Sequence, residues 1–331
     1  MPPAAVYAGR ESGQQRIIMA GDRDRYGAGE WFGHIVSSTP GPILNSLAHK
    51  AGMGFKQADM PCPFRETVEP GAKCNKKGGV CSLQVHREDD AGAVTAVGSF
   101  ITMCPSRFWQ DANVFRWIGN EILGTTKPVL IKEVDFLESV IAPDAPEDDS
   151  EEAKERDAVG RIDTVLVHPD KPNEWCALEL QAVYFSGAGM GSHLAQYGTA
   201  SGLVFPDKQR RPDFRSSGPK RLMPQLQTKV PTLRRWGRKM AVVVDVPFYK
   251  SLGPMIPVPH LSNSDIAWFV IDYDPATGAI KLHEKVFTTL ESSVEALTAG
   301  IPKSRESFEA KLSSLQTATT KAAKKKIIRL T

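Results

Sequence analysis

The chain has 331 residues, of which 41% are hydrophobic and 24% are charged, the composition of an ordinary globular protein with a sizeable core. No apolar run approaches the roughly 18 residues of a membrane span, and the first residues lack the layout of a secretion signal, so we expect a cytoplasmic protein without a membrane partner. The net charge of +3 is too small to identify a partner.

The charges are unevenly distributed along the chain. Residues 207–239 contain 11 Lys or Arg and 2 Asp, a local balance of +9. Residues 144–155 contain 7 acidic residues and 1 lysine, a local balance of −6. The basic stretch favours a surface that binds a polyanion, and a solvated helix face is the alternative.

Residues 56–105 are rich in proline and glycine turns, and only Val80–Val85 and Val94–Thr102 have the pattern of strands. Four cysteines fall in this region, with 11, 6 and 22 residues between them. Thiolates so placed suit a structural zinc or iron ion, and four buried reduced thiols are the alternative. The four are Cys62, Cys74, Cys81 and Cys104.

Two other residues could be mistaken for ligands of such a site. His86 lies in the first of these strands, where we expect it to be exposed rather than to bind metal. Cys176 stands apart in an apolar run, so we expect a buried thiol.

Helical and strand patterns alternate after residue 105, which predicts a mixed α/β core. We expect an N-terminal region at 1–105 and a core at 106–331. Within the core, the acidic segment 143–155 is expected to be an exposed connection or the start of a charged helix. The predicted helices are Arg107–Leu123, His193–Thr199, Pro224–Trp236 and about 303–322; the predicted strands are Val129–Phe136, Arg161–His168, Glu174–Phe185, Met240–Val246, Ile266–Tyr273 and Ile280–Thr288.

Acidic residues recur within the apolar strands. Glu179 stands in the run Trp175–Val183, where an ionised carboxylate costs several kcal/mol unless it is paired or holds a cation. Asp163 lies early on the preceding strand, and Glu133 repeats the pattern one strand earlier. Three acids on neighbouring strands suit Mg²⁺, which can acidify a water and neutralise charge on a phosphodiester.

This arrangement belongs to the motif class PD-(D/E)xK of nucleases, with Gln181 where lysine is usual. Strand alternation places Gln181 on the same face as Glu179. A neutral amide can orient the nucleophilic water but cannot supply a positive charge, so metal would do more of the electrostatic work.

With these features together, the chain resembles the NotI-type restriction endonucleases over about residues 31–240. The matching pieces are Phe32-Gly33-His34, Cys62-Pro63-Phe64 with Cys74, Gly79-Val80-Cys81-Ser82-Leu83, Cys104-Pro105, Asp163 with Glu179-Leu180-Gln181, and the segment 210–217.

The resemblance implies a restriction-endonuclease-like mixed sheet flanked by helices, with a loop-rich, metal-binding N-terminal region. Residues 106–331 would then form the catalytic and DNA-binding core. It implies a bacterial-type homodimeric type II enzyme of a restriction–modification system. It also implies structural iron on the four cysteines, active-site positions at Glu133, Asp163, Glu179 and Gln181, and a GC-rich palindromic target.

The basic stretch then supplies candidate contacts to DNA phosphates, which give affinity without sequence information. Gln225 and Gln227 are candidates for base readout, and Trp236 is expected in the core. The candidate phosphate contacts are Arg210, Arg211, Arg215, Lys220, Arg221, Arg234 and Arg235, with Arg238 and Lys239 following.

We therefore expect a sequence-specific, Mg²⁺-dependent endonuclease of double-stranded DNA. One alternative is a metal-stapled DNA-binding protein without catalysis. Another is a repair nuclease that reads DNA structure or damage rather than sequence.

Overall fold

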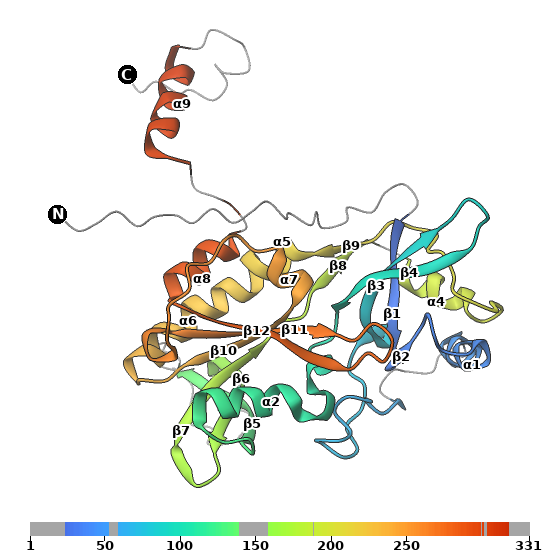
Figure 1. Ribbon diagram of the computed structural model, residues 1–331, viewed down its shortest axis with the longest axis horizontal. Coiled ribbons are helices and arrows are strands. Elements are labelled where there is room, and N and C mark those ends of the chain that lie inside the picture. The colour runs from blue at the N-terminus through green and yellow to red at the C-terminus, as the bar shows by residue number, and fades with distance from the viewer. Residues whose placement is uncertain are drawn as a thin grey trace, which may run out of the picture.

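The computed structural model describes residues 24–52, 59–138, 158–187, 189–298, 300 and 303–317, and the acidic segment 143–155 lies outside them. Helices lie on both faces of a six-stranded mixed sheet, and a four-stranded sheet stands beside it (Figure 1). The six-stranded sheet has the order β12(Ile280–Thr288), β11(Ile266–Tyr273), β10(Met240–Asp245), β7(Lys171–Leu180), β6(Ala158–His168), β5(Val129–Glu138).

The four-stranded sheet is antiparallel and comes from the N-terminal part of the chain. Its order is β2(His34–Ile35), β1(Asp24–Trp31), β3(Val80–Glu88), β4(Val94–Thr102), and a third, small sheet pairs β8(Tyr184–Ser186) with β9(Arg211–Asp213). The α-helices are α1(Gly41–Gly52), α2(Asn113–Ile118), α4(Met190–Gln196), α5(Phe214–Ser217), α6(Met223–Arg235), α7(Val246–Lys250), α8(Leu290–Leu297) and α9(Arg305–Thr317).

The three central strands of the large sheet are parallel, and its outer strands are antiparallel to their neighbours. Strand β10 is buried along its whole length, as expected for a strand covered on both faces. Its Val242 and Val244 face the side covered by α6, where they share a cluster with Leu226 and Val230. The alternate residue Val243 faces the α2 side. Helix α6 is thus fixed over one face of the sheet.

Most predicted strands are confirmed, including both hairpins of the large sheet. The predicted strand Glu174–Phe185 is wrong in its second half, because β7 ends at Leu180 and Tyr184 begins β8 in another sheet. The predicted helix Arg107–Leu123 is broken by left-handed residues Asp111 and Ala112. Its first part is a 3₁₀ helix, Pro105–Ala112, and only Asn113–Ile118 is α-helical.

Within the described ranges, every helix is too short or too polar to cross a bilayer. The division of the chain at residue 105 stays a prediction, although residues of both large sheets, such as Trp31 and Val242, pack in one buried cluster.

A buried ion pair joins the four-stranded sheet to the rest. Arg107 is 1% exposed, and its Nε lies 2.9 Å from both carboxylate oxygens of Glu30 on β1. Its guanidinium lies between the rings of Phe64 and Tyr273, at 4.3 and 4.5 Å from their centroids. Another guanidinium nitrogen donates to the carbonyl of Gly278 in the β11–β12 turn. One side chain therefore fixes three separate segments.

Replacing Arg107 with methionine should leave Glu30 as an unpaired buried charge. We expect the free energy of unfolding to fall by about 3–5 kcal/mol, measured by urea denaturation. Arg116→Met is the control, since that exposed side chain donates only to the carbonyl of Asp111 and to the side chain of Asn113, both nearby in the chain, and should cost no more than about 0.5 kcal/mol. Equal losses in the two variants would contradict the role of the ion pair.

The expectation that His86 is exposed is wrong. Its ring is completely buried between strand β1 and the loop before β9, with Nδ1 3.0 Å from the carbonyl of Val204. It meets the ring of His193 edge-on at 5.7 Å. Neither ring nitrogen of His193 has a hydrogen-bond partner in the described part of the chain, and burial lowers its pKa to about 3, with His86 and Arg210 adding to the effect.

Because the pKa of His193 is lowered on folding, the unfolded chain binds a proton near pH 6.5 that the folded chain does not. Stability is therefore present above about pH 6.5 and is lost as the pH falls toward 3. His193→Leu should reduce the slope of unfolding free energy against pH between 6 and 4 by up to about 1.4 kcal/mol per unit. Urea denaturation series of this variant and of His260→Leu, at an exposed histidine, give the comparison. An unchanged slope for His193→Leu would refute the assignment.

Candidate active site

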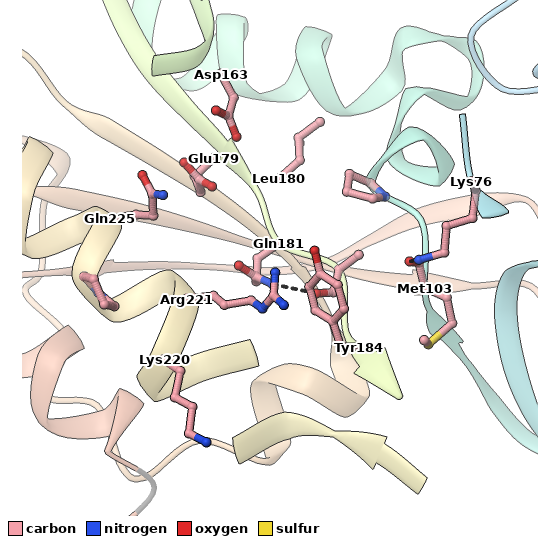
Figure 2. Close-up of a pocket in the computed structure, with 13 residues that line it drawn as sticks. Lys76, Met103, Asp163, Glu179, Leu180, Gln181, Tyr184, Lys220, Arg221 and Gln225 are labelled. Carbon is pink, nitrogen blue, oxygen red and sulfur yellow. Dashed lines mark hydrogen bonds between the residues drawn. The ribbon is translucent and has the colours of Figure 1, made fainter. Parts of the chain in front are cut away.

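Two carboxylates meet across strands β6 and β7. The antiparallel register pairs Thr164 with Leu178, so the next position places Asp163 opposite Glu179 on the same face of the sheet. That face is the one covered by α6. Figure 2 shows the two carboxyl groups side by side, and they are close enough for a hydrogen bond between them. The register thus brings together two of the predicted acids.

The carboxylate of Glu179 is almost completely buried, whereas Asp163 is exposed. Lys229 of α6 reaches it, with Nζ 3.1 Å from Oε2, and the two side chains are 3% and 8% exposed. Burial raises the pKa of Glu179, the ammonium of Lys229 opposes that shift, and the neighbouring Asp163 adds to it. Two adjacent carboxylates and one ammonium leave a site that favours additional positive charge.

These carboxylates line a pocket of about 380 Å³. Figure 2 shows Lys76 and Met103 on one wall, while Lys220 and Arg221 approach from the helical side. Arg221 stacks over the ring of Tyr184, with its guanidinium carbon 3.5 Å from the centroid. The pocket therefore places acids at one end and cations at the other.

A second pocket of about 320 Å³ adjoins the first. Asp163 and Gln225 line both, so the exposed carboxylate stands where the two meet. Arg161 and Lys229 supply the positive charges of the second pocket. A negatively charged chain crossing both pockets would meet cations on either side of the acids.

Gln181 lies in the first pocket, as strand alternation predicted. Its backbone N–H donates to the carbonyl of Val243 at 3.0 Å, which extends the parallel pairing beyond the end of β7. Its side-chain amide donates to the carbonyl of Ala182 at 2.5 Å. The amide is held in place with its oxygen available to a ligand or water.

Glu133 is not brought into either pocket. Its side chain is 75% exposed and lies 3.8 Å from Arg161. Its backbone has a φ of 55°, a left-handed value that non-glycine residues seldom adopt, so simple alternation does not place its side chain. Two of the three expected acids therefore converge in this structure, and a catalytic part for Glu133 stays a prediction.

Sequence reasoning missed Lys229, although a signal was present. On α6 the residues Leu226, Val230 and Leu233 form the buried face, and position 229 falls on that same face. A lysine on the apolar face of an amphipathic helix must find a buried partner, because its charge cannot reach water. The identity of that partner requires the three-dimensional packing.

The predicted phosphate contacts occupy different environments. Lys220 and Arg221 line the first pocket, and Arg211, Arg215 and Arg235 are exposed. Arg210 is buried, and donates to the carbonyl of Gly189. The DNA contacts of these residues stay predictions. The geometry favours contacts from Lys220 and Arg221, which line the pocket.

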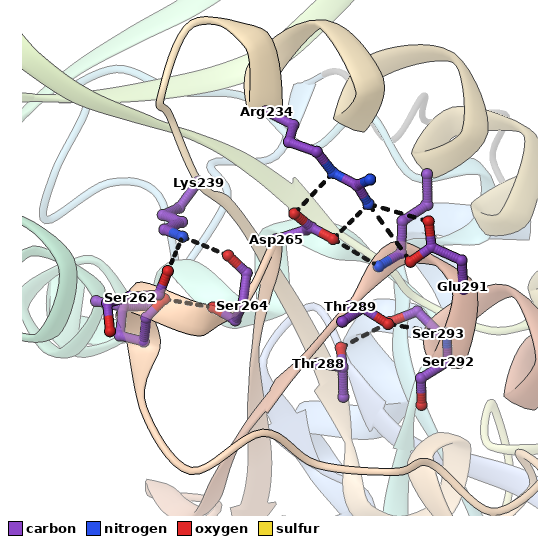
Figure 3. A network of polar contacts seen from close by, with 12 residues as sticks. Arg234, Lys239, Ser262, Ser264, Asp265, Thr288, Thr289, Glu291, Ser292 and Ser293 are labelled. Carbon is purple, nitrogen blue, oxygen red and sulfur yellow. Dashed lines mark hydrogen bonds and ion pairs between the residues drawn. The ribbon is translucent and has the colours of Figure 1, made fainter.

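Arg234 belongs to a polar network at the C-terminal end of α6 (Figure 3). Its guanidinium lies 2.6 Å from the carboxylate of Asp265 and 3.2 Å from that of Glu291. This arginine already has two acidic partners, which favours a structural part.

The expectation that Trp236 is in the core is wrong, since 52% of it is exposed. Its ring meets Phe136 and Trp175 edge-on, at 5.7 and 6.2 Å between centroids. Helix α6 ends at Arg235, so Trp236 follows the last turn and does not continue the buried face of the helix.

The four N-terminal cysteines are all buried, as is Cys176. Cys62 and Cys74 flank one short bridge, in which each backbone N–H donates across at 2.8 Å, to Ala72 and Met60 respectively. Cys104 donates its backbone N–H to the carbonyl of Cys81 at 3.2 Å. Burial raises the pKa of the Cys74 thiol, and its neighbours Cys104 and Cys62 add to that rise. The thiols thus lie near one another.

No group of three or more His, Cys, Asp or Glu side chains in the described ranges is arranged as a ready metal site. That result applies to the carboxylate pocket and to the four thiols.

Comparison with known proteins identifies the family to which the chain belongs. The family model described as restriction endonuclease NotI matches residues 47–283, more than two thirds of the chain, and a search of curated proteins found no match. The matched range contains the carboxylate pocket, the basic stretch and the four cysteines. The chain belongs to the NotI restriction endonuclease family, and is therefore a sequence-specific DNA endonuclease.

Proposed function

We propose that this enzyme hydrolyses phosphodiester bonds of double-stranded DNA with Mg²⁺ held by Asp163 and Glu179. The observation that carries the proposal is the contact of these carboxylates in one pocket, next to cationic side chains.

The donor set fits Mg²⁺. In proteins this ion is commonly bound by one or two carboxylates and keeps its other positions for water and substrate phosphate oxygens. Asp163 and Glu179 supply two carboxylates, and the pocket beside them is open to a phosphate. A site that is completed by substrate needs no third acidic ligand.

When bound, Mg²⁺ would acidify a water and neutralise charge on the attacked phosphate. The protein residues provide the positioning. Glu179 is fixed by the end of β7 and by Lys229, so its oxygens cannot rotate freely. Gln181, two residues further, can accept a hydrogen bond from the attacking water. Arg221 and Lys220 stand where the neighbouring phosphates of the strand would lie.

The finer features remain part of the proposal. A homodimer would present two such pockets and cut both strands, as symmetric recognition of a palindrome requires. We propose a GC-rich palindrome as the target, on the family resemblance, and a place in a restriction–modification system. Gln225 lines both pockets and is the better placed of the two glutamines for contact with DNA.

We also propose that the four N-terminal thiols hold one structural iron or zinc ion. Support comes from their burial, their arrangement in two backbone-linked pairs and their mutual electrostatic effect. A loop-rich segment has few regular hydrogen bonds to hold it, so an ion on four thiolates would stabilise its fold.

Glu179→Ala should abolish cleavage of plasmid DNA in Mg²⁺, because it removes one of the two proposed ligands. DNA binding in Ca²⁺, measured by fluorescence anisotropy, should persist. Glu174→Ala is the matched control, since that carboxylate lies on the same strand, is exposed and pairs with Lys171. Glu133→Ala shows whether that acid takes part.

Each outcome separates the alternatives. Binding by the wild type without strand scission would favour a DNA-binding protein without catalysis. Smears rather than discrete fragments from genomic DNA would favour a nuclease that reads structure. Sequencing of the fragment ends then gives the target and the position of the cut.

Cys81→Ser should remove the structural ion and lower the melting temperature. Elemental analysis of the purified wild type should give about one iron or zinc per chain. Cys176→Ser is the control, because it also alters a buried thiol but should keep the metal content. Wild-type protein free of both metals, or an unchanged content in Cys81→Ser, would refute the four-thiol site.

A further inference from the structure

We propose that Lys229 of helix α6 supplies to the active site the positive charge that the motif lysine ordinarily gives and that Gln181 cannot. The inference rests on the proposed nuclease function. It moves the active-site ammonium from the strand that carries Glu179 to the helix packed over it.

The placement of Lys229 is built by the fold. Pocket positions Gln225, Thr228 and Lys229 follow the spacing of one helix face, and all three line the second pocket with Asp163. Lys229 also belongs to the buried face of α6, which is anchored in the core through Leu226 and Val230. The ammonium is therefore held by helix packing rather than by a mobile surface chain.

The ammonium touches both the acid and the cavity. Its nitrogen lies 3.1 Å from Glu179 Oε2, and the side chain forms part of the pocket that Asp163 shares with the first. Gln181 lines the first pocket together with Glu179, and its amide donates to the carbonyl of Ala182. The positive charge of the motif lysine is absent at position 181. The ammonium of Lys229 lies within hydrogen-bond distance of the Glu179 carboxylate.

A purely structural role explains the presence of Lys229 less well. A buried ion pair seldom stabilises a fold more than apolar residues of similar size, because both groups lose their hydration. An apolar residue at position 229 would continue the stripe formed by Leu226, Val230 and Leu233. A functional role for its charge in the pocket explains why position 229 is a lysine. Since it acts through Glu179, we regard it as a positioning residue.

The test compares Lys229→Met with Lys229→Gln, which keeps a hydrogen-bond donor without the charge. The readouts are the single-turnover cleavage rate at saturating DNA and Mg²⁺, the DNA dissociation constant in Ca²⁺, and the melting temperature. We expect both variants to lose about 10²-fold or more in rate, by analogy with other lost electrostatic contacts. The dissociation constant should change far less than the rate. Lys250→Met, at an exposed lysine of α7, is the control.

Moving the charge separates the two explanations. In the double variant Gln181→Lys with Lys229→Gln, the ammonium returns on the strand, and we expect at least about a 10-fold recovery of the rate. If Lys229 is only structural, the folded fraction of each variant cuts at the wild-type rate and the second change gives no recovery. Should Lys229→Met fail to fold, Lys229→Gln and the double variant decide the matter in the same way.

Failure of this inference can be told from failure of the proposed function. If the wild type cuts DNA, Glu179→Ala does not, and both Lys229 variants keep the wild-type rate, Lys229 has no part while the nuclease assignment stands. If the wild type with Mg²⁺ leaves DNA intact, the proposed function itself is wrong.

Discussion

The site depends on one electrostatic constraint, the burial of the Glu179 carboxylate beside Asp163 at the end of a central strand. Water reaches the exposed Asp163 but hardly reaches Glu179, and the ammonium of Lys229 only partly offsets this loss of hydration. Burial therefore raises the pKa of Glu179 in spite of Lys229. The folded protein therefore holds negative charge in a place where a divalent cation would relieve it. In our proposal the fold supplies the acids and one ammonium, and a bound Mg²⁺ would supply the remaining positive charge.

The rest of the fold keeps this arrangement rigid. Helix α6 is anchored over the sheet and carries Lys229 to the acids, while its preceding turn carries Lys220 and Arg221 to the pocket. The opposite wall includes Lys76, from the loop between Cys74 and Cys81, whose ammonium donates to the carbonyl of Met103 at 2.5 Å. The N-terminal region is therefore part of the pocket, and Arg107 ties it to the remainder of the molecule.

The sequence pattern predicted those features of the structure that depend on residues close together in the chain. Apolar, β-branched runs bounded by turn residues located the strands of the large sheet, and an acid within an apolar run identified Glu179 before any coordinates. The pattern failed where tertiary packing decides. Phe185 continues an apolar run but pairs with Pro212 in a different sheet, and the left-handed backbone of Glu133 is invisible in the residue letters. Lys229 is 50 residues from Glu179, so its part required the contact itself.

The most direct measurement of the central claim is the anomalous X-ray signal of Mn²⁺, used in place of Mg²⁺, in crystals of the enzyme with uncleaved DNA. The account predicts a peak bonded to carboxylate oxygens of both Asp163 and Glu179, at about the 2.0–2.6 Å that hard cations adopt with oxygen ligands. It also predicts a phosphate oxygen of the DNA at the same ion. A peak held elsewhere, or crystals in which Asp163 and Glu179 face DNA without any bound ion, would contradict it.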